Sequence, residues 1–239
     1  MPKILSPLQQ YLSSSRTIHY SLILTLPLVA IYEIGILIIF RDSFFELRNS
    51  GEILVRNLFT YLGLTDPSII SGLLVTIFLV VMIRGYQIEK KPGLQANFFI
   101  YMLLESMLWG GLLYVVMQLF TRLPLQIISF EDKLANLNLA LGAGIFEELI
   151  FRMIVISALL VVLEQGLSIP EGWSISFAIF ISAGIFAAFH LLMEPYSLPI
   201  FAQRVFAGIL LGILYRYRGY GVNVYAHVVY NILILAGTW

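Results

Sequence analysis

The stretch from Leu137 to Leu163 reads LNLALGAGIFEELIFRMIVISALLVVL. It is long enough to cross a bilayer as a helix, which takes about 20 residues. Its apolar run is interrupted near the centre by Glu147, Glu148 and Arg152. Each such charge at mid-bilayer costs about 2.5–3.5 kcal/mol on insertion scales. We therefore expect these three side chains to face protein or water rather than lipid.

The whole chain has the composition of a membrane protein. Of 239 residues, 59% are hydrophobic and only 12% are charged, and the mean hydropathy is +0.91. An average soluble domain carries about 25% charged residues, so the composition excludes an ordinary soluble enzyme and a disordered chain. The 14 Lys and Arg residues balance the 14 Asp and Glu residues, which leaves no basic field for nucleic acid. The absence of cysteine excludes disulfides and thiol catalysis.

The apolar runs predict an all-α polytopic membrane protein with a bundle of about seven transmembrane helices. The predicted spans are residues 20–40, 69–84, 96–120, 137–163, 173–193, 198–216 and 222–239. Residues 51–64 predict an amphipathic helix, either in the membrane interface or packed on the bundle. We expect one integrated membrane domain, in which residues 1–136 carry no recognisable motif and residues 137–239 form the core with the motifs.

The charges in the predicted loops indicate an orientation. They place seven Lys and Arg residues on the N-terminal side and five on the other side. Under the positive-inside rule this favours a cytoplasmic N terminus. We expect an integral protein of a prokaryotic plasma membrane, with the lipid bilayer as its surroundings.

The spacing of the three central charges separates their roles. Glu148 and Arg152 are four residues apart, so they lie on one helix face and can pair. Glu147 is turned by about 100° and cannot share that partner equally well. One carboxylate is thus held by a guanidinium, and the other is left for another task. The alternative is that all three form a buried network that only fixes helix packing.

Two further helices carry polar residues in apolar surroundings. His190 ends the segment Phe186-Ala187-Ala188-Phe189-His190, and Phe186 lies one turn before it, where its ring can orient the imidazole. His227 and Asn231 are four residues apart and project from one face of the last helix. Two histidines, an amide and an unpaired carboxylate on three apolar helices indicate a shared polar site.

Several chemistries suit this set of side chains. A carboxylate beside a neutral imidazole can deprotonate water, and a histidine with an asparagine can stabilise an oxyanion. The same residues could hold Zn²⁺ through Glu147, His190 and His227 with an open fourth position, although the sequence lacks His-Glu-x-x-His. A proton relay in a transporter is a third interpretation, but paired broken helices in two halves are not evident.

The three motifs together resemble the CPBP intramembrane proteases, also called the Abi or CAAX-protease family, which includes Rce1-type prenyl-protein endopeptidases. The family pattern is Glu-Glu-x-x-x-Arg, then Phe-x-x-x-His, then His-x-x-x-Asn. It is matched here by Glu147 to Arg152, Phe186 to His190 and His227 to Asn231. The resemblance covers residues 137–239.

The resemblance implies a polar, water-filled intramembrane cavity and an endopeptidase acting on a membrane-associated peptide or protein, with or without a lipid modification. It implies that Glu147 and His190 activate water, that His227 and Asn231 stabilise the oxyanion, and that Arg152 anchors Glu148. Members of the family have been described both as metalloproteases and as glutamate proteases. A non-catalytic scaffold or a bacteriocin self-immunity protein of the same family is the alternative function.

For four other residues in the predicted membrane helices we expect structural roles, namely hydrogen bonding or helix packing. Glu33 and Glu105 are predicted to hydrogen-bond locally, to Tyr32, Ser106 or Trp109, although they could also line the cavity or bind a peptide terminus. Gly142 and Gly144 precede the charged motif and are predicted to let a neighbouring helix approach it.

Overall fold

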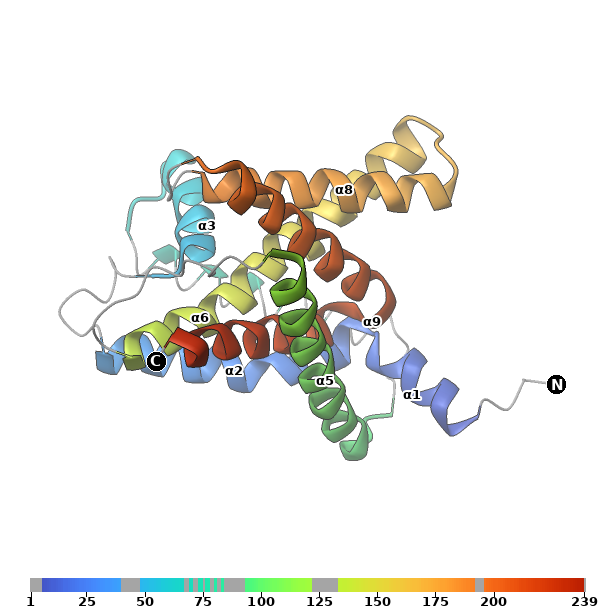
Figure 1. Ribbon diagram of the computed structural model, residues 1–239, viewed down its shortest axis with the longest axis horizontal. Helices are drawn as coiled ribbons and strands as arrows, with labels where there is room; N and C mark the ends of the chain where they lie inside the picture. The colour runs from blue at the N-terminus through green and yellow to red at the C-terminus, as the bar shows by residue number, and fades with distance from the viewer. Residues whose placement is uncertain are drawn as a thin grey trace.

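The computed structural model describes residues 6–39, 48–66, 93–121, 133–191 and 196–238, with scattered positions between 69 and 83. Every regular element in these ranges is helical (Figure 1). The helices are α1 (Pro7–Ser15), α2 (Ile18–Ile39), α3 (Ser50–Tyr61), α5 (Ala96–Thr121), α6 (Lys133–Glu147), η2 (Glu148–Ile156), α7 (Ser157–Val161), η3 (Val162–Gly166), α8 (Glu171–His190) and α9 (Leu198–Thr238). The predicted all-α class is confirmed for the described residues.

Four of these helices are long and apolar enough to cross a bilayer. They are Ile18–Ile39, Ala96–Phe120, Glu171–His190 and Leu198–Gly237, so the chain is an integral membrane protein. The predicted span over residues 69–84 lies largely outside the described residues, and the count of seven spans stays a prediction.

Helix α9 consists of two helices joined at a glycine. Gly219 has φ 79° and ψ −179°, a conformation that a residue with a Cβ avoids. The chain changes direction there (Figure 1), which agrees with the separate spans predicted over 198–216 and 222–239. A Cβ on Gly219 would also lie 2.9 Å from the carbonyl oxygen of Arg16. Glycine is therefore required by both the backbone and the close approach.

The segment with the charged motif is helical throughout, from Lys133 to Gly166, but it is not uniformly α-helical. Residues Glu148–Ile156 form a π-helix directly after Glu147. An α-helix was predicted over the whole segment, and that prediction is wrong for Glu148–Ile156. A π-helical turn is rare and is found mostly at functional sites. The wider turn begins at the second glutamate of the motif.

The predicted amphipathic helix over residues 51–64 corresponds to α3 (Ser50–Tyr61). Its first turn packs on α6, because a Cβ on Gly51 would lie 3.1 Å from the Cβ of Phe146. Asn49 caps the helix by accepting a hydrogen bond from the Gly51 N–H at 2.8 Å. The structure thus favours the second of the two predicted settings, a helix packed on the bundle.

The close approach predicted at the glycines of α6 is also present. A Cβ on Gly144 would lie 2.4 Å from Cγ2 of Val228 in α9, and one on Gly142 would lie 2.5 Å from the Tyr32 ring in α2. The glycines bring α6 against both neighbours, and the Gly144 contact places α9 beside the charged motif.

Replacing Gly144 with Ala is expected to destabilise the bundle by about 1–3 kcal/mol, because the added methyl group overlaps Val228. The reversible unfolding of the protein in mixed micelles measures the change. Gly111→Ala is the matched control, since a Cβ on Gly111 in α5 meets no atom within 4 Å. Equal stability of the two variants would contradict the packing described here.

Candidate active site

Glu148 is the centre of a buried polar cluster that joins η2 to α9. Its side chain is fully buried and lies 3.1 Å from Nε of Arg152 through Oε2. Its Oε1 accepts a hydrogen bond from Nδ1 of His227 at 2.7 Å, and its Oε2 accepts one from the Asn223 amide. The predicted pairing of Glu148 with Arg152 is confirmed. A carboxylate with these three partners is held in one orientation.

Arg152 is buried as completely as its partner. It is 1% exposed, and its guanidinium carbon lies 4.7 Å above the centre of the Phe186 ring in α8. A cation over an aromatic face gains electrostatic stabilisation that increases when water is excluded. The guanidinium therefore links the π-helix to α8, the helix that carries His190.

The imidazole of His190 is fixed by its own helix. Its Nδ1 lies 2.9 Å from the carbonyl oxygen of Phe186, one turn earlier. The two rings pack edge to face, with centroids 4.7 Å apart, so Phe186 orients the imidazole as predicted. A carbonyl oxygen only accepts hydrogen bonds, so Nδ1 carries the proton. The other ring nitrogen, Nε2, then presents a lone pair whenever the ring is neutral.

Both histidines face Glu147. Nε2 of His190 lies 4.0 Å from Oε1 of Glu147, and Nε2 of His227 lies 4.0 Å from Oε2 of the same carboxylate. Glu147 is 5% exposed and His227 is 4% exposed. The predicted meeting of these three side chains is thus present in the structure, and each 4.0 Å gap is wide enough for one bridging water with hydrogen bonds of about 2.8 Å.

The two sides of the His227 ring have different partners. Nδ1 donates to Glu148 and Nε2 faces Glu147. A proton on Nε2 would make this nitrogen a donor directed at the space beside Glu147.

Asn231 contacts the backbone of α6 rather than Glu148. Its amide donates to the carbonyl oxygen of Ala140 at 3.4 Å, two turns before Glu147 on α6. Asn223, which the sequence analysis did not single out, contacts Glu148 instead. The signal was present, since Asn223 is four residues before His227 and shares its helix face.

The spacing of the side chains does not suit a resident metal ion. Ligands at about 2.0–2.1 Å from a tetrahedral zinc are about 3.3 Å apart, whereas Glu147 is 4.0 Å from each histidine nitrogen. Within the described ranges, no group of three or more His, Cys, Asp or Glu side chains could hold a metal ion. The residues predicted for zinc, Glu147, His190 and His227, therefore do not fit it as placed.

The two other intramembrane glutamates pair with distant arginines. Glu33 accepts from Nη1 of Arg48 at 2.8 Å, and Glu105 accepts from Arg218 at 2.7 Å. Local hydrogen bonding was predicted, and only the bond from Trp109 Nε1 to Glu105, at 3.2 Å, agrees with it. The pairing with Arg48 and Arg218 was missed because both arginines lie outside the helices of their partners and become neighbours only on folding.

One comparison with known proteins finds a family for the C-terminal part of the chain. Residues 131–233 match the family described as type II CAAX prenyl endopeptidase Rce1-like. The match confirms the CPBP-family resemblance that the three motifs carry. No curated protein and no solved structure matches the chain. This chain is therefore a helical membrane protein whose C-terminal part is similar to the Rce1-like endopeptidases.

Proposed function

We propose that this protein is an intramembrane endopeptidase that cleaves a peptide bond of a membrane-associated protein or peptide. The observation that carries the proposal is the convergence of both histidine Nε2 atoms on Glu147, each 4.0 Å away. Both Nδ1 atoms are engaged elsewhere, by Phe186 and Glu148. The Nε2 atoms of His190 and His227 and the carboxylate of Glu147 therefore face one another.

In the proposed reaction, a water bound between Glu147 and His190 attacks the carbonyl carbon of the scissile peptide. One water proton moves to the Glu147 carboxylate as the new C–O bond forms. The tetrahedral intermediate then collapses, and the proton passes from Glu147 to the leaving amine nitrogen as the C–N bond breaks. The carboxylate is regenerated, and no covalent intermediate with the protein forms.

The developing oxyanion needs a donor, and His227 supplies it. For this role the imidazole needs a proton on each nitrogen, with Nδ1–H donating to Glu148 and Nε2–H directed toward the site. A donor already fixed before the reaction stabilises the oxyanion without reorganisation. Asn231 extends the same face of α9 and lines the path of the peptide, one turn beyond His227. Arg152 and Asn223 fix the Glu148 carboxylate, and this carboxylate fixes the imidazole of His227.

The family description suggests the first substrate to test, a peptide with a C-terminal prenylated cysteine motif. We expect the purified protein in liposomes to cleave this peptide or its unmodified counterpart. His190→Ala should reduce the rate by about 10²-fold or more, because the water loses one of its two partners. Glu164→Gln, an exposed change on η3, should match the wild type. Equal rates for His190→Ala and wild type would contradict the proposal.

Chelation separates carboxylate chemistry from zinc chemistry. Because the 4.0 Å separations exceed those of zinc ligands, we expect cleavage to persist after treatment with 1,10-phenanthroline and dialysis. Elemental analysis of the same sample should then give far less than one metal ion per chain. Loss of activity that Zn²⁺ restores would show that the site closes around a metal.

A further inference from the structure

Helix α3 lies outside the residues that match the Rce1-like family, yet it forms one wall of the site. A Cβ on Gly51 would lie 3.2 Å from the backbone nitrogen of Glu147. A Cβ at this distance is tighter than ordinary van der Waals contact, so a side chain here would push the two backbones apart by a few tenths of an ångström. The position of α3 therefore bears directly on the position of Glu147.

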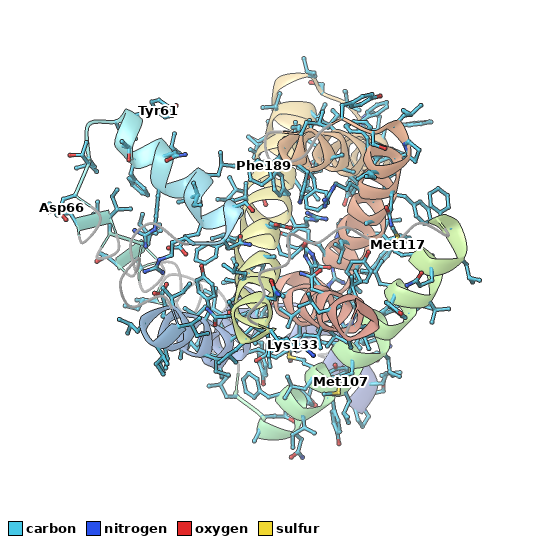
Figure 2. The ribbon with its side chains drawn as sticks, turned by 60° about the vertical axis from the view of Figure 1, so that its left-hand side comes forward. Tyr61, Asp66, Met107, Met117, Lys133 and Phe189 are labelled. Carbon is cyan, nitrogen blue, oxygen red and sulfur yellow. The ribbon has the colours of Figure 1, made fainter. Side chains whose placement is uncertain are left out.

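The next turn of α3 contacts the other side of the site. Leu54 and Val55 pack against the buried cluster of Ile150, Phe151, Phe186 and Phe189. This cluster includes the residue whose carbonyl oxygen accepts the His190 hydrogen bond. In Figure 2, Phe189 lies beside the inner end of α3, and Tyr61 marks the outer end. One face of α3 thus contacts the backbone of Glu147 and the apolar cluster that contains Phe186, the residue that orients His190.

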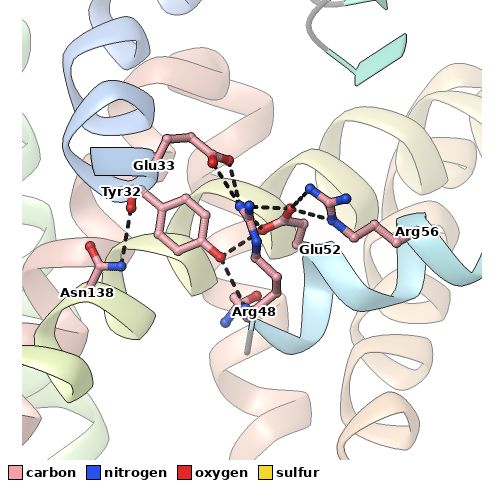
Figure 3. A network of polar contacts seen from close by, with 7 residues as sticks. Tyr32, Glu33, Arg48, Glu52, Arg56 and Asn138 are labelled. Carbon is pink, nitrogen blue, oxygen red and sulfur yellow. Dashed lines mark hydrogen bonds and ion pairs between the residues drawn. The ribbon is translucent and has the colours of Figure 1, made fainter. Parts of the chain in front are cut away.

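What holds α3 in place is a buried ionic cluster rather than apolar packing alone (Figure 3). Glu52 is fully buried and accepts hydrogen bonds from Arg56 at 2.6 Å and from the Tyr32 hydroxyl at 2.8 Å. It also lies 3.2 Å from Nη1 of Arg48. Arg48 in turn reaches Glu33 on α2. Two carboxylates and two guanidinium groups balance each other, and they connect α3 to α2.

The cluster is continued to α6 by Tyr32. Its hydroxyl accepts from the backbone N–H of Asn49 at 3.1 Å, directly before α3 begins. Its ring packs edge to face on Phe146, the neighbour of Glu147, with centroids 5.7 Å apart. Burial alone would lower the pKa of the Arg48 guanidinium, but Glu52 and Glu33 raise it above its ordinary value. Arg48 therefore stays charged and keeps its contacts with both carboxylates.

We infer that Glu52, with Arg48, Arg56 and Tyr32, positions α3 and through Gly51 fixes Glu147 for the reaction. A buried ion cluster adds little stability over apolar side chains of equal volume, and its best-attested use is to define one arrangement. Here the arrangement defined is the one in which α3 closes against the proposed base. These are positioning residues, since none of them touches the reacting atoms. The inference rests on the proposed peptidase function.

The first arm of the test uses catalysis. Gly51→Ala adds a methyl group against the Glu147 backbone and leaves the ionic cluster intact. We expect kcat to fall about 3- to 10-fold, because a misplacement of ~1 Å costs about 10²-fold and the shift needed here is a few tenths of that, while KM changes less than threefold. Glu52→Gln should likewise lower kcat and leave KM nearly unchanged. Gly111→Ala is the control and should match the wild type, because a Cβ on Gly111 meets no atom within 4 Å. Wild-type kcat in Gly51→Ala would overturn the inference.

The second arm does not depend on catalysis and uses the absence of native cysteine. Leu54→Cys places a single thiol where α3 packs on the apolar cluster, and Leu58→Cys places one a turn farther along the helix, where Leu58 is already 59% exposed. Adding Glu52→Gln should accelerate maleimide labelling at position 54 by about tenfold and leave position 58 unchanged. An unchanged rate at position 54 would overturn the inference. A wild type that cleaves no peptide would refute the proposed function, while labelling would still report whether Glu52 holds α3.

Discussion

Replacing Glu147 with Gln is expected to lower kcat for peptide cleavage by about 10²- to 10⁴-fold, the range that a general base contributes. The amide keeps the size of the carboxylate and its position between the two histidines, each 4.0 Å away, but it cannot accept the water proton. Initial rates in liposomes at saturating peptide measure the effect. KM should stay within a few-fold of wild type, since the change removes an interaction made in the transition state.

The control for this change is Glu164→Gln, which makes the same substitution on the exposed surface of η3. A Glu147→Gln rate within threefold of wild type would show that Glu147 is not the base. If that variant loses cleavage but keeps the biological phenotype of the protein, the non-catalytic scaffold or immunity function is favoured. Proton or substrate flux across liposomes would instead favour the transporter.

The largest expected effect on stability is at Glu148. Glu148→Gln should reduce the free energy of unfolding by about 3–5 kcal/mol, because it leaves Arg152 charged and uncompensated in a setting where it is 1% exposed. It also weakens the hydrogen bond that fixes Nδ1 of His227. Activity should therefore fall with stability. Reversible unfolding in mixed micelles measures the first effect, and the peptide assay measures the second.

A second substitution separates charge from packing. Adding Arg152→Met to Glu148→Gln removes the uncompensated cation while keeping an apolar stem against Phe186. We expect the double variant to recover at least half of the lost stability but none of the activity, because His227 still lacks its carboxylate partner. A double variant that is no more stable than Glu148→Gln would show that charge compensation is not what Glu148 provides.

The parts of the site that the sequence predicted lie within single helices. Glu148 with Arg152, and Phe186 with His190, are both four residues apart, so helical periodicity alone places each pair together. The meeting of Glu147 with the two histidines required a further argument. Polar side chains in three apolar helices are too costly to face lipid, so they were expected to share one interior, and they do.

The parts that the sequence did not predict depend on contacts between distant segments. The partners of Glu33 and Glu105 are Arg48 and Arg218, and no periodic pattern connects them. The ionic cluster at Glu52 was missed because a stretch with Glu52 and Arg56 is also typical of a solvated helix face. The π-helix after Glu147 was missed for another reason, since its residues, Glu148–Ile156, have ordinary helical composition.

A double-mutant cycle between Glu147 and His190 tests most directly whether these residues act on one water. Cleavage rates are needed for wild type, Glu147→Gln, His190→Ala and the double variant. Residues that work as a unit give strongly non-additive effects, so we predict that the double variant is no slower than the slower single variant. Rate losses that multiply would show that the two side chains act independently, and they would contradict a shared hydrolytic site.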